Sequence, residues 1–67
     1  MSNPTDRIQF LPLDEVRRRT TLSKSTVYEL MRRGKFPRPA NLGGRNVRWL
    51  ESEIDSWAAE RAAERSI

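Results

Sequence analysis

Hydroxyl and basic side chains are concentrated in one stretch of this 67-residue chain, residues 20–37. Within it, Val27, Leu30 and Met31 have the i, i+3, i+4 spacing of the buried stripe of an amphipathic helix. Ser23 stands just before this helix, where its hydroxyl can cap the first turn. The opposite side of the helix carries Ser25, Glu29, Arg32 and Arg33, with Thr26 and Tyr28 on its flanks. Groups of these types bind phosphates and base edges, so the helix is suited to a nucleic-acid groove.

The polar groups of this helix suit different contacts with DNA. Glu29 can accept a hydrogen bond from a cytosine amino group, and Arg32 can reach a guanine edge or a phosphate. The predicted DNA-binding set in this recognition helix is Ser23, Lys24, Ser25, Thr26, Tyr28, Glu29, Arg32 and Arg33. The alternative is that Ser23 only caps the helix and its polar face is an ordinary solvated surface. The turn before the helix and the hairpin after it favour DNA binding.

A second candidate element surrounds a pair of glycines. Gly43-Gly44-Arg45 separates two short extended runs, residues 40–42 and 46–49, which predicts a β-hairpin. An arginine on such a wing can enter a narrowed minor groove, where the negative potential is strong. The predicted DNA-binding wing residues are Gly44, Arg45, Asn46 and Arg48. The alternative is a solvated turn with Arg48 paired to a carboxylate. Nucleotide binding is not favoured, because the P-loop lysine pattern is missing.

Further cations lie at the end of the first helix and after the second. The first helix of a helix-turn-helix crosses the DNA backbone, which makes phosphate contacts from its arginines plausible. Cations at this helix end also complement the helix dipole, which explains at least one of Arg17, Arg18 and Arg19 equally well. The predicted phosphate contacts are Arg17, Arg18, Lys35 and Arg38.

The hydrophobic pattern indicates the elements that must position these groups. Residues 8–11 alternate apolar and polar side chains, as in a short strand. A first helix runs from residue 13, and a tight connection over residues 20–22 leads into the second helix, residues 24–33. Gly34 suits the left-handed position that ends this helix. The last helix begins between residues 50 and 52 and frays beyond residue 62.

This order of elements predicts a mainly α fold with a small β-hairpin, a winged helix-turn-helix in a single domain. We expect residues 8–62 to form this DNA-binding domain, with residues 1–7 as a flexible N-terminal arm and residues 63–67 as a frayed C-terminal tail. The predicted core consists of Phe10, Leu13, Val16, Leu22, Val27, Leu30, Met31, Phe36, Leu42, Val47, Trp49, Ile54 and Trp57.

The composition limits the classes of function. Cysteine and histidine are both absent, which excludes disulfides, thiolate metal sites and histidine-based catalysis. We therefore expect no metal, no cofactor and no enzyme activity. Thirteen Lys and Arg against nine Asp and Glu give a net charge of +4, which fits an anionic partner. No apolar run is long enough to span a membrane, and the N-terminus shows no signal-peptide pattern.

Three motifs carry a family resemblance: FLPLDEVRRRTTLSKSTVYELMRRGKFPRP, NLGGRNVRW and LESEIDSWAAER. Together they resemble the AlpA-type regulators of prophages, a branch of the MerR/excisionase-like winged-helix group. The resemblance implies a small cytoplasmic DNA-binding protein. It places the recognition-helix role on Lys24, Ser25, Thr26, Tyr28 and Arg32 and the wing role on Arg45 and Arg48. Family members commonly have Gly where this chain has Thr21. Because a β-branched residue disfavours positive φ, this turn either avoids that conformation or is strained.

Three functions remain open from the sequence. The first is a sequence-specific regulator that binds double-stranded DNA near phage or mobile-element genes. The second, also implied by the resemblance, is an excisionase-like factor that directs recombination with an integrase partner. The third is a protein-interaction module or anti-repressor. Since one domain covers a short stretch of groove, we expect a homodimer or a cooperative multimer on DNA.

Overall fold

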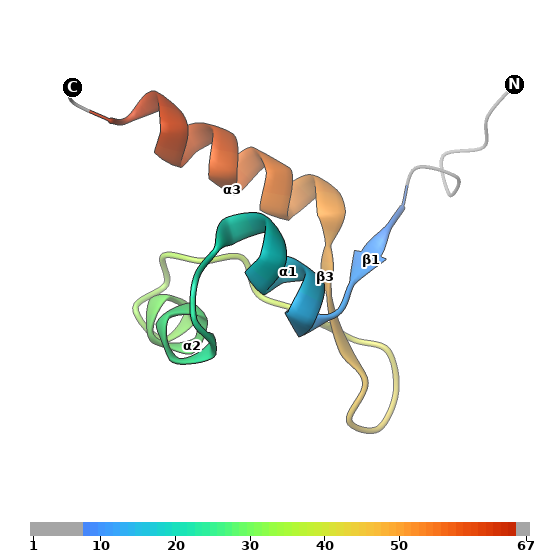
Figure 1. Ribbon diagram of the computed structural model, residues 1–67. Coiled ribbons are helices and arrows are strands. Elements are labelled where there is room, and N and C mark those ends of the chain that lie inside the picture. Colours follow the sequence, from blue (N-terminus) through green and yellow to red (C-terminus); the bar gives the residue numbers. More distant parts are fainter. Residues whose placement is uncertain (1–7, 66–67) are drawn as a thin grey trace, which may run out of the picture.

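The computed structural model describes residues 8–65, so the arm predicted for residues 1–7 and the last two residues of the predicted tail lie outside the described residues. The elements are, in order, β1 (Phe10–Leu11), α1 (Leu13–Thr20), α2 (Lys24–Arg32), β2 (Ala40–Asn41), β3 (Val47–Leu50) and α3 (Glu51–Ala63). In Figure 1, α1 lies between α2 and α3, and the hairpin of β2 and β3 projects from the body of the domain. Two helices joined by a short turn and followed by a hairpin form the predicted winged helix-turn-helix.

The strands form a small antiparallel sheet in the order β1-β3-β2. Leu11 pairs with Trp49, and Phe10 pairs with Leu50. Because successive side chains of a strand point to opposite faces, Leu11 and Trp49 share the core face and Phe10 points outward. Leu11 is 4 % exposed and Phe10 is 39 % exposed. The prediction that Phe10 belongs to the core is therefore wrong, and Leu11 occupies that position instead.

The core lies between the sheet and the three helices. Its buried side chains are Leu11, Val16, Val27, Phe36, Trp49 and Ile54, and the partly buried side chains packed against them are Leu13, Leu22, Leu30, Met31 and Trp57. Val47, which the sequence also predicts in the core, is half-buried. Leu42, at 50 % exposed, is the second wrong core prediction. It follows β2 in the hairpin loop, where its N–H donates to the Asn46 carbonyl at 2.7 Å, and this loop projects away from the helices (Figure 1).

The ends of α2 and α3 follow their local signals to within one residue. Ser23 Oγ accepts a hydrogen bond from the Thr26 N–H at 3.2 Å and so caps α2. Arg33 is the C-cap, and Gly34 follows with φ of 70°, as the sequence predicts for a left-handed glycine. α3 ends at Ala63, one residue beyond the predicted limit.

The turn that connects α1 to α2 contains a strained residue. Thr21 has φ of 60° and ψ of 15°, and it is the one non-glycine residue with positive φ in the described part of the chain. Its N–H donates to the Arg17 carbonyl at 2.7 Å, which closes the last turn of α1. Of the two alternatives that the sequence leaves open, the structure therefore has the strained one.

Both tryptophans hold the segment between α2 and β2. Trp49 Nε1 donates to the Pro37 carbonyl at 2.9 Å, and Trp57 Nε1 donates to the Lys35 carbonyl at 2.7 Å. Phe36 lies between these two anchored carbonyls, and its ring meets the Trp57 ring edge-on with centroids 4.8 Å apart. The segment that leads from α2 to the hairpin is thus fixed against β3 and α3, which sets the position of the hairpin relative to α2.

Candidate nucleic-acid interface

The first turn of α2 presents a cluster of hydroxyl groups. Ser23 Oγ donates to Thr26 Oγ1 at 2.9 Å and lies 3.3 Å from Ser25 Oγ. All three side chains are exposed, as are Lys24 and Tyr28. The free backbone N–H groups of a helix N-terminus favour an anion, so this turn combines hydroxyl donors with a favourable backbone field.

The second half of the α2 face is an ion-paired cluster. Glu29 Oε1 accepts a hydrogen bond from Arg33 Nε at 3.0 Å, and Glu29 Oε2 accepts from Arg32 Nη2. The side chains of Arg32 and Arg33 are 76 % and 62 % exposed, and that of Glu29 is 40 % exposed. The three predicted contact residues thus lie together on the surface, with the carboxylate already bonded to both arginines.

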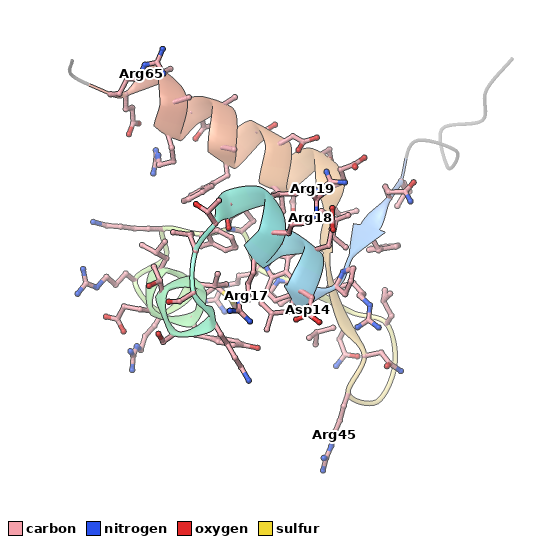
Figure 2. The ribbon with its side chains drawn as sticks, in the orientation of Figure 1. Asp14, Arg17, Arg18, Arg19, Arg45 and Arg65 are labelled. Atoms are coloured by element: carbon pink, nitrogen blue, oxygen red, sulfur yellow. The ribbon has the colours of Figure 1, made fainter. Side chains whose placement is uncertain are left out.

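The hairpin presents one arginine outward and folds the other back. Asn41 Oδ1 accepts a hydrogen bond from the Gly43 N–H at 2.8 Å, and the Asn46 N–H donates to the Gly43 carbonyl at 3.0 Å. This turn places Arg45 at the tip, pointing away from the domain (Figure 2). Arg48 is half-buried, and its Nη1 donates to the Val47 carbonyl at 2.8 Å. Arg45 is therefore the freer of the two predicted wing arginines.

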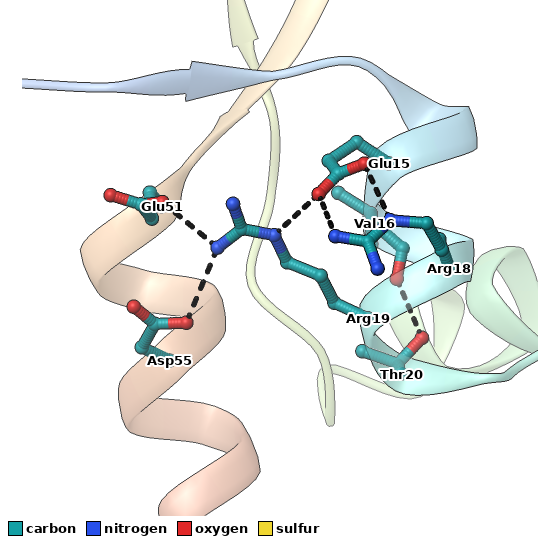
Figure 3. Close-up of polar contacts among 7 residues, drawn as sticks. All are labelled: Glu15, Val16, Arg18, Arg19, Thr20, Glu51 and Asp55. Atoms are coloured by element: carbon teal, nitrogen blue, oxygen red, sulfur yellow. Dashed lines mark hydrogen bonds and ion pairs between the residues drawn. The ribbon is translucent and has the colours of Figure 1, made fainter.

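The three arginines of α1 have different surroundings. Arg18 bonds Glu15 through Nε at 2.9 Å and Nη2 at 2.6 Å, and Arg19 Nε bonds the same carboxylate at 2.8 Å (Figure 3). The hydrogen bonds from Arg18 and then from Arg19 lower the pKa of Glu15 from 4.5 to about 2. Figure 2 shows Arg17 on the side of α1 nearer α2, whereas Arg18 and Arg19 lie nearer α3. Arg17 takes no part in the ion pairs that Glu15 makes with Arg18 and Arg19.

The two cations that follow α2 are exposed side chains on a fixed backbone. Lys35 and Arg38 lie on the segment whose carbonyls are bound by the tryptophans, and both side chains are exposed. No ion pair among residues 8–65 includes either of them. Both cations are therefore accessible to a phosphate, and the anchored backbone limits how far they can move. Their phosphate contacts stay a prediction.

Two residues that shape this surface are absent from the predicted site. Arg19 reaches from α1 to α3, with Nη1 2.8 Å from Glu51 Oε2 and 3.7 Å from Asp55 Oδ1 (Figure 3). Asn41 forms the hydrogen bond that closes the hairpin turn. An Asn two residues before Gly is a local signal for such a turn. The α3 partners of Arg19, Glu51 and Asp55, could not be found this way, because they lie more than thirty positions away in the sequence.

Two other kinds of site are not found in the described part of the chain. Residues 8–65 contain no group of three or more acidic, histidine or cysteine side chains that could hold a metal ion. None of the three described helices is long and apolar enough to cross a membrane.

The helix-turn-helix, the anchored hairpin and the third helix define a winged helix-turn-helix protein. Residues 9–62 match the family model described as "Prophage CP4-57 regulatory protein (AlpA)", and the chain belongs to this family of prophage regulators.

Two curated relatives show different degrees of similarity. The chain is 51 % identical over 57 residues to the uncharacterized protein ORF88 of Enterobacteria phage P4, an alignment that covers 85 % of this chain and 65 % of that protein. It thus spans slightly less than two thirds of the length of ORF88. It is 29 % identical over 65 residues to the DNA-binding transcriptional activator AlpA of Escherichia coli (strain K12), covering 88 % of this chain and 93 % of that protein.

Proposed function

We propose that this protein is a sequence-specific regulator that binds double-stranded DNA of phage or mobile-element genes. In this proposal α2 enters the major groove and the hairpin of β2 and β3 lies on the backbone or in the minor groove. The observation that carries the proposal is that α2 has an exposed face of hydroxyl and basic side chains, while Arg45 projects from the tip of the hairpin that follows it (Figure 2). The name of the E. coli relative, a DNA-binding transcriptional activator, supports the same function.

The proposed contacts divide according to element. The residues facing base edges and nearby phosphates are Ser23, Lys24, Ser25, Thr26, Tyr28, Glu29, Arg32 and Arg33 of α2 and its cap. The wing contacts are Gly44, Arg45, Asn46 and Arg48, and the phosphate contacts are Arg17, Arg18, Lys35 and Arg38. Arg17 is better suited to a phosphate than Arg18, because Arg18 is already bonded to a carboxylate within α1. The protein would act in the cytoplasm, as a homodimer or cooperative multimer on its DNA.

Selection of bound DNA from a random duplex pool, followed by footprinting at physiological salt, tests this function. We expect one enriched motif, protected from cleavage, with major-groove modification of its bases interfering with binding. Binding should also weaken as salt increases, because phosphate contacts release counterions. A pool without enrichment, together with no measurable binding to any duplex, would exclude the function and favour a protein-interaction module.

The same footprints separate a regulator from an excision factor. A single site next to a promoter supports transcriptional regulation, whereas tandem sites with bent DNA beside an attachment site support an excisionase-like role with an integrase. The match to a prophage regulatory family and the name of the E. coli relative favour the first of these.

A further inference from the structure

The centre of the exposed α2 face carries one carboxylate between two guanidinium groups. Both oxygens of Glu29 are occupied, Oε2 by Arg32 three positions later and Oε1 by Arg33 four positions later, at 3.0 Å for the second pair. Glu29 is the one acidic residue of α2. The cluster therefore has a net charge of +1, although two arginines stand at the surface predicted to meet DNA.

This ion-paired cluster affects the affinity for random DNA and the affinity for matched DNA differently. Affinity for random duplex comes mainly from cations that bind phosphates and release counterions. A guanidinium held by a carboxylate contributes less to this affinity for random duplex, and the carboxylate itself is repelled by phosphates. Because exposed ion pairs are weak, DNA that offers better partners can open them.

A matched base sequence offers such partners. A guanine edge presents two acceptors to an arginine such as Arg32, which can then leave the carboxylate of Glu29. Random sequence seldom provides such acceptors at the right positions. On random DNA the carboxylate therefore either stays bonded to its arginines or loses them and faces the DNA without a partner. The cost of the cluster therefore falls mostly on mismatched DNA, which is the condition for specificity.

We propose that Glu29 is a positioning residue that determines specificity: its carboxylate holds and neutralises Arg32 and Arg33 so that they do not bind phosphates irrespective of sequence. The inference rests on the proposed DNA-binding function and assigns Glu29 a role through its neighbours. Removing the carboxylate should therefore strengthen binding to the wrong DNA.

The test compares Glu29→Gln with Glu60→Gln, which changes the net charge equally but lies on the exposed surface of α3. Dissociation constants are measured over a salt titration for the selected duplex and for a random-sequence duplex of equal length. For Glu29→Gln we expect affinity for the random duplex to rise on the order of tenfold, and the salt slope to steepen by about 0.9 for each arginine released. Glu60→Gln should leave both quantities close to those of the wild type.

A second pair of variants tests whether the effect passes through the arginines. In an Arg32→Ala/Arg33→Ala background, adding Glu29→Gln should change the affinity for random duplex by less than about twofold, because no guanidinium remains to be released. Glu29→Ala, which retains high helix propensity, repeats the measurement, and far-UV circular dichroism verifies the fold of each variant.

Three results would overturn the inference. Glu29→Gln binding random duplex like the wild type would show that the carboxylate does not restrain the arginines. Loss of affinity for the selected duplex alone would make Glu29 a direct base reader, and an effect that persists without the arginines would make it simple repulsion. Failure of the proposed function differs from all of these, since the wild-type protein would then bind no duplex, and the inference would fall with it.

Discussion

The role of each arginine in this protein depends on what its guanidinium already binds. Arg18 and Arg19 bond Glu15, and Arg61 bonds Glu64 at 2.9 Å while its guanidinium carbon lies 5.7 Å from the Trp57 ring centroid. Arg45 takes part in no ion pair among residues 8–65 and points outward from the hairpin tip (Figure 2). An unpaired, projecting guanidinium offers its whole charge to a phosphate, so Arg45 should affect DNA affinity more than its paired counterparts.

Replacing Arg45 with Ala should weaken binding to all duplexes alike. A lost phosphate contact removes about one released counterion, so the slope of log affinity against log salt should become shallower by about 0.9. Salt titrations with selected and random duplexes measure this. Arg65→Ala removes the same charge beyond the end of α3, far from the hairpin (Figure 2), and should leave the slope unchanged. A loss confined to one base sequence would instead make Arg45 a base reader.

Thr21 stores strain that glycine would relieve. A β-branched residue at φ of 60° is rare and costs on the order of 1–3 kcal/mol, part of which is offset by the greater unfolded-state entropy of glycine. We expect Thr21→Gly to increase the free energy of unfolding by about 1 kcal/mol, measured by urea denaturation. Thr26→Gly, within the helical backbone of α2, should do the opposite. A Thr21→Gly protein no more stable than the wild type would mean that the turn is not strained.

Between elements, the link from α1 to α3 depends on ionised carboxylates. Arg19 bonds Glu15 within α1 and also reaches Glu51 and Asp55 on α3 (Figure 3). Exposed ion pairs contribute little singly, but here one guanidinium joins two helices through three carboxylates. Protonation of Glu15 should therefore remove one of the partners that hold Arg19 in this position.

Stability should decrease as the pH falls below about 4.5. The pKa of Glu15 in the folded protein, about 2, lies below its usual value of 4.5, so the unfolded chain binds protons more readily. The stabilisation by Glu15 is therefore complete above about pH 4.5 and is lost as the pH approaches 2. Urea midpoints measured across this range should fall more steeply for the wild type than for Glu15→Gln. Equal steepness in Glu15→Gln and the wild type would contradict the assignment.

The segment between α2 and the hairpin should be sensitive to the indole N–H of Trp57. Trp57→Phe retains an aromatic ring against Phe36 but loses the bond to the Lys35 carbonyl, which should cost about 1 kcal/mol of unfolding free energy. Trp57→Ala removes the ring as well and should cost about 3 kcal/mol. Urea denaturation ranks the variants, and equal stability of Trp57→Phe and the wild type would show that this hydrogen bond does not hold the segment.

At the scale of the whole molecule, local signals were readable from the sequence and pairings between distant segments were not. Ser23 and Gly34 predict the ends of α2 because caps depend on adjacent residues. The face of β1 depends on pairing with β3, so a two-residue strand did not reveal that Leu11 rather than Phe10 lies inside. The exposed face of α2 was likewise predictable from helical spacing, whereas its contacts with DNA remain predictions.

The size of the domain predicts more than one copy on each DNA site. In the proposed complex, the nine residues of α2, Lys24–Arg32, would read a short stretch of major groove, and one wing would add contacts largely independent of sequence. Genomic discrimination requires several correctly read base pairs, each contributing about 1–3 kcal/mol. We therefore expect at least two protein copies per selected duplex, with half-sites about one helical turn apart, as measured by sedimentation of the complex at saturation. Shortening the duplex to one half-site should reduce affinity sharply. A complex of one copy per duplex, with undiminished affinity for the half-site, would show that a single domain suffices.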